Sequence, residues 1–433
     1  MGGRKMTLAE VMLWGTKIGT VAFDDESGYG TFEYDSAFLR SGIEVSPIVM
    51  PLSPHVYQFN NLSRESFHGL PGLLSDSLPD KYGNAVINAW LRKNGRSPES
   101  FNPVERLCYT GQRGMGALEF VPARGPQDSE AESIDLDNLV QLASEILQAR
   151  EGMHVKADEN AMKEIIRVGT SAGGARAKAV IAWNEKTGDI RSGQIKAGDG
   201  YGYWLIKFDG VSKNGDKEGE DSHQYTRIEY AYSLMARDAG IKMSECRILK
   251  DGNRRHFLTR RFDRDLKTGS KIHMQSLGAI AHFDFNQPGE HSYEDAATVM
   301  RKLSVAKPDF SQLFRRMVFN VMASNNDDHV KNISFLMDKK GNWRLAPAYD
   351  ITYAYNPDGM WTGSHQMRIN GKQKDITMED LLSAGKNMDL RKAEAEEAID
   401  AVRNSLDKWH TFADQAEINS LDIKRIKDQL ILL

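Results

Sequence analysis

Cysteine is scarce in this 433-residue chain, which contains only Cys108 and Cys246. Two cysteines cannot build a disulfide framework or a zinc cluster, so neither kind of site is expected. The chain also lacks an apolar run long enough to span a bilayer, and residues 1–10 contain no apolar core of signal-peptide length. These absences predict a cytoplasmic protein with reduced thiols and no membrane partner.

A strong excess of one charge is absent as well, because 56 basic and 60 acidic side chains give a net charge of −4. Nothing in the overall charge therefore indicates a nucleic-acid or membrane partner. The nearest candidate for a local basic patch is the set Arg254, Arg255, Arg260 and Arg261. Such a set is more typical of a solvated or phosphate-facing strand end than of a DNA-binding surface.

The length of the chain exceeds what one hydrophobic core usually serves, so more than one domain is expected. Short strands are predicted within residues 11–34, and glycines predict loop and turn over 107–120. Strands are predicted to dominate residues 178–262, and helices follow from Tyr293 onward.

We therefore expect an α+β protein in three consecutive parts. A small mixed α/β module covers 1–125, a strand-rich lobe covers 126–262, and a helical lobe covers 263–433.

The most informative stretch runs from Asn325 to Asp350. Asp327 is followed five residues later by Asn332, which is the spacing of a protein-kinase catalytic loop. In such loops the aspartate takes the proton of the substrate hydroxyl, and the asparagine and a later aspartate hold magnesium. Asn332 and Asp350 supply oxygen ligands of the kind that magnesium prefers. The competing interpretation is a polar loop before a hairpin, where Asn and Asp are common.

His329 and Lys331 lie inside this stretch and are candidates for phosphate contacts. His329 could also serve as a general base, although a structural hydrogen-bonding role is more typical of this position.

A second stretch, Gly169 to Lys178, is rich in small residues, whose backbone N–H groups can cradle phosphate oxygens. It matches neither the Walker A pattern nor the protein-kinase glycine loop. A flexible hairpin turn is an equally good interpretation, and Lys178 is either a phosphate contact or a solvated strand residue.

Lys207 lies in the apolar strand 203–208, where a lysine must be paired or face an anion. Kinases place their phosphate-binding lysine in this setting. Glu229, on the next predicted helix, is a candidate partner, although a surface glutamate is the commoner outcome. Further on, Arg260, Arg261 and Phe262 could form a hinge that contacts adenine, or Phe262 could simply be a core residue.

In this order the motifs resemble the HipA-like serine/threonine kinases, the toxins of bacterial type II toxin–antitoxin pairs. The resemblance extends over essentially the full length. It is carried by the front strands, by the segment Gly69 to Asp80, and by five motifs at residues 171–178, 205–208, 261–264, 327–332 and 347–350.

The resemblance implies a two-lobed kinase-like fold with ATP and Mg²⁺ as cofactors. It implies Asp327 as catalytic base and Asn332 and Asp350 as metal ligands. The residues that would line the nucleotide are Gly173, Gly174, Ala175, Arg176, Ala177, Lys178, Lys207, Arg260, Arg261, Phe262, His329, Val330, Lys331, Asn332, Tyr349 and Asp350.

The resemblance also implies regulation and partners. Ser171 would be autophosphorylated, and the added charge would be repelled from the ATP phosphates and reorder the loop. A HipB-like helix-turn-helix antitoxin would neutralise the kinase and connect it to operator DNA. The substrate would be a translation component such as an aminoacyl-tRNA synthetase, with growth arrest and persistence as the outcome.

Two departures from the family pattern stand out. Ile351 follows the metal aspartate, so there is no Asp-Phe-Gly, and Arg260 stands where the relatives usually have an acidic residue. Two alternative functions stay open: a small-molecule kinase on the same scaffold, and a pseudokinase that acts as a transcriptional co-repressor.

Overall fold

The computed structural model describes residues 6–125, 133–149, 165–166, 168–169, 176–194, 197–211 and 224–433. The chain divides into two compact units that interleave in sequence. The first unit is Met1–Asp216, Arg260–Gln275 and Met337–Gly341, and the second is Lys217–Thr259, Ser276–Leu336 and Asn342–Leu433. The expected division into three consecutive domains stays a prediction.

The first unit combines short helices with antiparallel strands. Its strands are β1 (Met6–Leu13), β2 (Thr16–Asp24), β3 (Tyr29–Tyr34), β4 (Leu118–Val121), β5 (Lys178–Trp183), β6 (Ile190–Ser192), β7 (Gly202–Lys207) and most of β10 (His273–Ser276). Its helices are η1 (Phe38–Ser41), α1 (Arg64–Phe67), α2 (Gly72–Ser75), α3 (Lys81–Lys93), η2 (Pro98–Ser100), α4 (Pro103–Thr110) and α5 (Leu136–Ala149).

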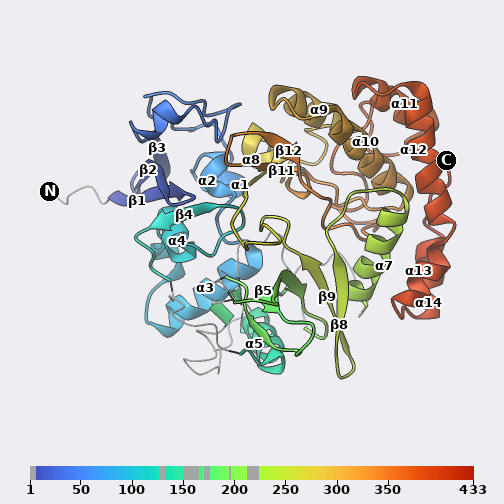
Figure 1. Ribbon diagram of the computed structural model, residues 1–433, viewed down its shortest axis with the longest axis horizontal. Coiled ribbons are helices and arrows are strands. Elements are labelled where there is room, and N and C mark those ends of the chain that lie inside the picture. The colour runs from blue at the N-terminus through green and yellow to red at the C-terminus, as the bar shows by residue number, and fades with distance from the viewer. Residues whose placement is uncertain are drawn as a thin grey trace. The chain divides into compact units, whose positions relative to one another are not determined.

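The front module, which we define as residues 6–125, is built on a sheet with strand order β3-β2-β1-β4 (Figure 1). Residues of β1 alternate between exposed and buried, as expected for a strand with one face on a core. Helix α4 packs on this sheet and begins with an Asn102 capping box. Helix α4 includes residues 107–110 and β4 includes residues 118–120, so the prediction of loop and turn is confirmed for 111–117 and was wrong at both ends.

The glycines misled that prediction, since they lie mainly at and after the end of α4. Gly111 is the C-cap of the helix, and Gly116 has a φ of 74° just before β4. The apolar residues between and around them supply the core, with Leu107 and Leu118 both buried.

Strands β5, β6 and β7 form the middle of the first unit, with β5 between its two antiparallel neighbours. The β5 residues from Lys178 to Ala182 are all buried. Trp204 and Phe208 are fully buried at and just after β7. The three strands confirm the prediction of an apolar, strand-rich segment.

The second unit is mainly helical. Its helices are α7 (Tyr225–Asp238), α8 (Leu277–Ala281), α9 (Tyr293–Lys302), α10 (Lys307–Met322), η3 (Val330–Asn332), α11 (Met378–Asn387), α12 (Lys392–Leu406), α13 (Trp409–Gln415) and α14 (Ser420–Lys427). Its strands are β8 (Cys246–Asp251), β9 (Arg254–Arg260), β11 (Ser334–Met337) and β12 (Trp343–Leu345), and the last residues of β9 and β11 belong to the first unit.

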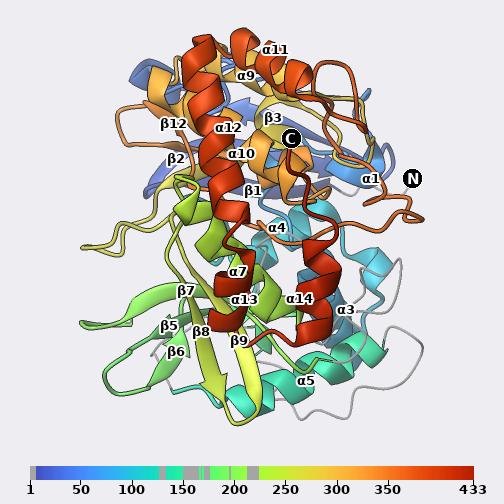
Figure 2. The same cartoon turned by 90° about the vertical axis from the view of Figure 1, so that its right-hand side faces the viewer.

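Helix α10 is central to the second unit because α9, α11 and α12 all pack on it (Figure 2). Phe314 and Phe319 on α10 are completely buried, and so is Trp409 on α13. Helices α12 and α13 also contact α7. The amphipathic pattern of the sequence therefore correctly predicted both α10 and the helical tail, and α10 ends directly before the candidate catalytic loop.

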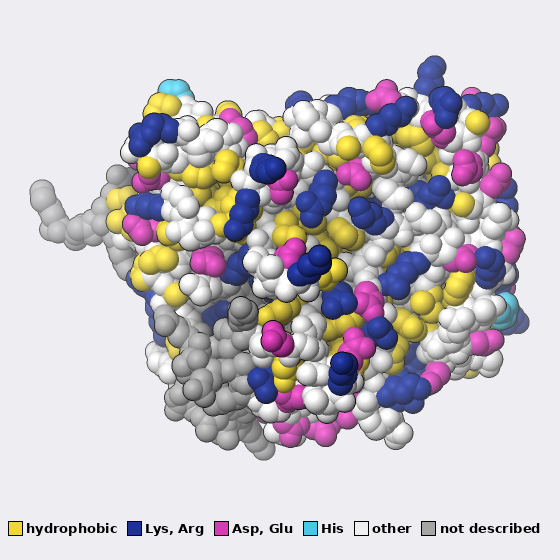
Figure 3. Space-filling model, in the orientation of Figure 1, with side chains coloured by type: hydrophobic (Ala, Val, Ile, Leu, Met, Phe, Trp, Pro, Cys, Tyr) yellow, Lys and Arg dark blue, Asp and Glu magenta, His cyan; other side chains and the backbone are white. Residues whose placement is uncertain are grey.

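The surface agrees with the small net charge. On the face drawn in Figure 3, basic and acidic side chains are interspersed, with hydrophobic side chains between them. Cys108 and Cys246 are both buried and free. Within the described ranges, no helix combines the length and apolar character needed to cross a membrane.

Candidate active site

The candidate catalytic loop, residues 323–332, begins where α10 ends. The Asn325 amide donates to Asn320 Oδ1 at 2.8 Å, which holds the start of the loop against the helix. Asn326 is held through its backbone N–H, which donates to the Ala354 carbonyl at 3.0 Å. The polar residues before Asp327 therefore satisfy backbone and side-chain groups and give the loop one conformation.

Asp327 and Asn332 are brought together as their spacing predicted. The Asn332 side-chain amide donates to the Asp327 carbonyl at 2.7 Å, across the short helix η3. The Asp327 carboxylate is 48% exposed and lies 3.8 Å from His329 Nε2. The loop therefore presents a carboxylate to solvent, where it can reach a substrate hydroxyl.

His329 has a structural role in this loop. Its Nδ1 accepts a hydrogen bond from the Lys331 backbone N–H at 3.2 Å, and its carbonyl accepts from Asn332 N at 2.8 Å. The Lys331 ammonium lies 4.1 Å from the centre of the Phe285 ring, a cation–π distance. Val330, the first residue of η3, is buried.

Asp328 is the residue of this loop that the sequence did not reveal. Its carboxylate is 1% exposed and accepts from the Gln366 backbone N–H at 2.7 Å and from the Tyr293 hydroxyl at 2.9 Å. His365 Nδ1 lies 3.1 Å from the same carboxylate. Burial, aided by the Asp328 carboxylate, holds the pKa of Tyr293 well above its usual value, so the hydroxyl stays protonated and donates.

Asp328 therefore anchors the loop to α9 and to residues 365–366, while the side chain of Asp327 is exposed. A buried charge with three partners is stable only if all of them are kept.

The hairpin of β11 and β12 leads to the second acidic residue, Asp350. The Tyr349 hydroxyl donates to the Lys331 carbonyl and lies beside Ser334 Oγ, both at 2.5 Å, which links the end of the hairpin to the catalytic loop. The buried Arg316 of α10 donates to the Ala346 carbonyl at 2.6 Å, and burial lowers the pKa of Arg316 to about 10. Asp350 has a φ of 55°, in the left-handed region.

The residues Asn332 and Asp350 fit a magnesium ion by donor type. Donation from the Asn332 amide nitrogen to the Asp327 carbonyl leaves the amide oxygen as the group that can bind a cation. One amide and one carboxylate are few ligands, yet magnesium commonly takes one or two carboxylates and completes its shell with substrate phosphates. The described residues contain no cluster of three His, Cys, Asp or Glu side chains that could hold a metal alone.

The two candidate lysines of the first unit are direct neighbours. Lys178 of β5 and Lys207 of β7 are register partners in the antiparallel pair, so both side chains extend from the same face. Lys178 is 1% exposed and Lys207 is 8% exposed. The alternative of a solvated strand lysine at position 178 is therefore wrong.

Lys178 is paired with Asp80 of the front module. The ammonium lies 2.8 Å from Asp80 Oδ2, and the two side chains are 1% and 6% exposed. Glu229, the carboxylate that the sequence offered to Lys207, is buried on α7. Its pairing with Lys207 stays a prediction.

The predicted hinge is fixed by a buried ion cluster. Asp263 accepts from Arg261 Nε at 2.9 Å and Nη2 at 2.7 Å, from Arg264 Nη1 at 2.8 Å and from Gly116 N at 2.7 Å. Burial would raise the pKa of Asp263, but Arg261 and Arg264 outweigh it and hold that pKa well below its usual value. Arg261 N also donates to the Tyr203 carbonyl at 2.9 Å.

The side chain of Arg261 therefore has a structural role. The guanidinium of Arg260 lies 5.3 Å from the centre of the Trp204 ring. The next residue in the predicted hinge, Phe262, is partly exposed.

The candidate phosphate loop, Gly169 to Lys178, is described only at its two ends. Ser171, Gly173, Gly174 and Ala175 lie outside the described residues, whereas Arg176 is partly exposed and Ala177 is buried. The Ala177 carbonyl accepts from Phe208 N at 3.2 Å, which continues the pairing of β5 with β7 past Lys178.

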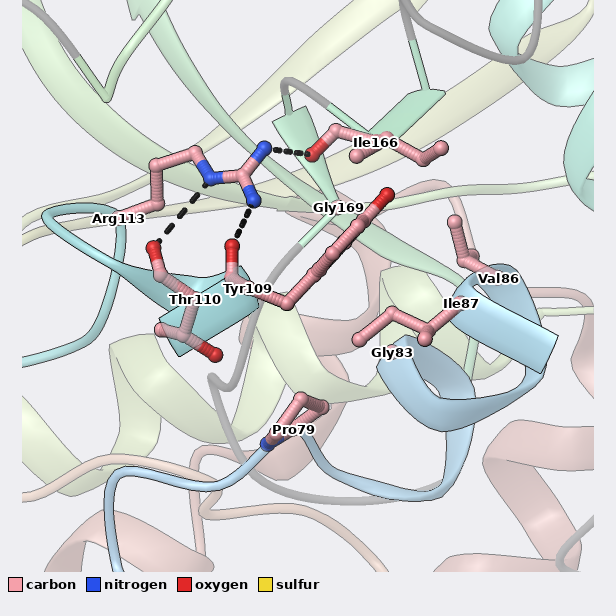
Figure 4. A pocket seen from close by; sticks show the side chains of 9 residues that line it. All are labelled: Pro79, Gly83, Val86, Ile87, Tyr109, Thr110, Arg113, Ile166 and Gly169. Atoms are coloured by element: carbon pink, nitrogen blue, oxygen red, sulfur yellow. Dashed lines mark hydrogen bonds between the residues drawn. The ribbon is translucent and has the colours of Figure 1, made fainter. Parts of the chain in front are cut away.

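A small pocket of the first unit is lined by residues of α3 and α4 together with Ile166 and Gly169 (Figure 4). Its cavity volume is about 20 Å³, room for about one water molecule. It is too small for a nucleotide, so it does not compete with the candidate site.

Comparison with known families decides the affiliation of the chain. Residues 170–409, more than half of the chain, match the family described as HipA-like C-terminal domain. Residues 9–121 match the HipA N-terminal domain. The chain belongs to the HipA-like family.

Curated relatives of this HipA-like chain are named as candidate kinases. Y4mE of Sinorhizobium fredii is 26% identical over 188 residues, which cover 41% of this chain and 37% of the relative. A Haemophilus influenzae protein is 28% identical over 161 residues, covering 33% of this chain and 47% of the relative. The alignments thus span less than half of each relative.

The fold is that of HipA. A solved structure of Shewanella oneidensis MR-1 HipA, in complex with HipB and its operator DNA, matches 98% of this chain and 96% of its own with a TM-score of 0.66. The sequence identity is 17%, so the likeness concerns the fold. It confirms the predicted α+β, kinase-like fold.

Proposed function

We propose that this HipA-like chain is an ATP-dependent protein serine/threonine kinase that acts as a growth-arresting toxin. The observation that carries the proposal is the catalytic loop, in which the Asp327 carboxylate is exposed while Asn332 is hydrogen-bonded to the Asp327 backbone. Membership of the family and the naming of relatives as kinases support it.

In the proposed reaction the Asp327 carboxylate takes the proton of a serine or threonine hydroxyl. The hydroxyl oxygen forms a bond to the γ-phosphorus of ATP as the bond to the bridging oxygen of ADP breaks. Asn332 and Asp350 would hold Mg²⁺, which neutralises charge on the phosphate oxygens when bound. Lys178, Lys207 and Lys331 would contact the phosphates.

The remaining nucleotide contacts are proposed from the family pattern. They comprise the loop Gly173 to Ala177, the hinge Arg260 to Phe262, and the residues His329, Val330 and Tyr349 around the catalytic loop.

The partners follow from the family as well. We propose a HipB-like helix-turn-helix antitoxin that connects the kinase to operator DNA, and the Shewanella complex of HipA, HipB and operator DNA supports this. The protein substrate would be a translation component such as an aminoacyl-tRNA synthetase. Autophosphorylation at Ser171 would switch the kinase off, since a phosphate there repels the phosphates of ATP.

Transfer of labelled phosphate tests the function. Purified protein is incubated with γ-labelled ATP, Mg²⁺ and a bacterial lysate, and the expected result is a labelled protein band. Label found only in metabolites would instead favour a small-molecule kinase, and no label with an unchanged growth effect would favour a pseudokinase. Mass spectrometry of the same active protein is expected to find phosphate on Ser171, and its absence would contradict self-inhibition at that serine.

A further inference from the structure

The buried lysine pair of the first unit requires negative charge nearby. Lys178 and Lys207 are directly opposite on neighbouring strands, and both are less than a tenth exposed. Two buried ammonium groups side by side repel each other, and each has lost most of its water. Carboxylates must therefore hold the pair in place before the phosphates of a nucleotide can use it.

Asp80 meets this need for Lys178 and is itself immobilised. It is the N-cap of α3, where its Oδ1 accepts from Gly83 N at 2.6 Å, while Oδ2 accepts from the Lys178 ammonium at 2.8 Å. Each oxygen thus has its own partner, and the position of α3 fixes the carboxylate. A fixed, 6%-exposed carboxylate sets where the ammonium lies on β5.

The same module also holds the chain on the other side of the phosphate loop. The Arg113 guanidinium, just after α4, donates to the Ile166 carbonyl at 3.2 Å and to the carbonyls of Thr110 and Tyr109 (Figure 4). Gly169 lies against α3, since a Cβ there would come within 3.9 Å of the Val86 Cγ2 atom. Front-module residues therefore contact the chain at Ile166 and at Lys178.

We propose that Asp80 of the front module is a positioning residue for the nucleotide site, because it holds the Lys178 ammonium in the place where it meets the phosphates. In protein kinases a helix of the small lobe provides the carboxylate for the phosphate-binding lysine. Here the carboxylate for Lys178 comes from outside the lobe, 98 residues earlier in the chain. This inference rests on the proposed function, since it presupposes that Lys178 meets ATP.

Removing the charge of Asp80 tests the proposal. Asp80→Asn keeps a good N-cap for α3 but removes the carboxylate, so the helix should stay intact while Lys178 loses its counter-charge. We expect ATP to bind at least ~10-fold more weakly by calorimetry with a non-hydrolysable analogue. KM for ATP should rise by a similar factor and kcat should change less, because Asp80 acts on binding and not on the proton transfer at Asp327.

Two comparisons separate positioning from general structural damage. Glu10→Gln removes another lysine-paired carboxylate of the front module, 2.7 Å from Lys17 but exposed, and should leave ATP affinity within twofold of wild type. The double variant Asp80→Asn/Lys178→Met should bind ATP no more weakly than Lys178→Met alone, because the two residues act as one unit.

ATP affinity of Asp80→Asn within twofold of wild type would overturn the proposal, and so would fully additive effects in the double variant. If Asp80→Asn does not fold, Asp80→Glu replaces it, since that variant keeps the charge but moves the carboxylate by one methylene. It should then weaken ATP binding, and wild-type affinity would again overturn the idea. Failure of the wild type to bind ATP would instead refute the proposed function itself.

Discussion

The catalytic loop of the second unit and the lysine pair of the first unit are held in opposite ways. In the loop, the contact that holds the candidate base Asp327 is local, since Asn332 reaches the Asp327 carbonyl across five residues through a neutral hydrogen bond. In the lysine pair, Lys178 depends on a carboxylate 98 residues away, and both groups are buried and charged. The local, neutral contact leaves the Asp327 carboxylate exposed. The distant, charged contact accompanies burial of the Lys178 ammonium.

The difference predicts how each region responds to substitution. An exposed functional group can be altered with little effect on folding, so its loss should appear in the rate. A buried charge cannot lose its partner without leaving the other charge unsolvated, so its loss should appear in stability or in ligand affinity.

The largest expected effect lies within the loop itself. Asp327→Asn should lower the rate of phosphoryl transfer by about 10²- to 10⁴-fold, the usual contribution of a general base. Asp328→Asn removes the same charge one residue later and should cost far less activity per folded molecule. It should instead lower the free energy of unfolding by about 1–3 kcal/mol, because Asp328 accepts hydrogen bonds in the interior.

For both variants, an assay of labelled phosphate transfer measures the rate, and urea denaturation measures the free energy of unfolding. Equal loss of transfer at the two positions would refute the division of roles between Asp327 and Asp328. Unchanged stability of Asp328→Asn would show that its buried contacts contribute little.

The next prediction concerns the buried charge of Asp263 in the first unit. Asp263→Ala leaves Arg261 and Arg264 buried without their carboxylate, and should cost about 3–5 kcal/mol of unfolding free energy. Asp265→Ala, two residues away at an exposed turn, is the matched control and should cost much less. Urea denaturation followed by fluorescence measures both, and similar losses would mean that the buried cluster has no special role.

The contrast also explains what could be predicted from the sequence. The proposed roles of Asp327 and Asn332 were predicted from a spacing of five residues, and the structure brings the two residues together through a hydrogen bond. The helices after Tyr293 were predicted from local periodicity, and strands β5 and β7 were predicted from local composition, at 178–184 and 203–208. These features depend on neighbours in the sequence.

Asp80 and Asp328 could not be found in that way. Their partners, Lys178 and Tyr293, lie 98 and 35 residues away, and nothing in their own surroundings marks them as buried. For Asp80 a weak signal existed, since an aspartate before a helical stretch predicts an N-cap. The helix α4 was missed for a different reason, because three nearby glycines outweighed its Asn102 cap and its apolar residues.

The last effect concerns the pH dependence of a buried neutral group of the first unit. Burial lowers the pKa of His273 to about 4, below the usual 6.5 of an unfolded chain. Between these values the unfolded state binds more protons, so stability is fully present above pH 6.5 and is lost as the pH falls toward 4.

The slope from His273 should be about 1.4 kcal/mol per pH unit at most, roughly 3 kcal/mol in all. His273→Gln should remove that part of the slope in urea denaturation at pH 4 to 7. The matched control is the same substitution at an exposed position, His410→Gln on α13. Asp263 loses its contribution only at lower pH, since its pKa is held below the ordinary carboxyl value. As the pH falls, protonation of His273 should therefore lower the unfolding free energy before protonation of Asp263 does. If His273→Gln keeps the wild-type slope of unfolding free energy against pH, that order is contradicted.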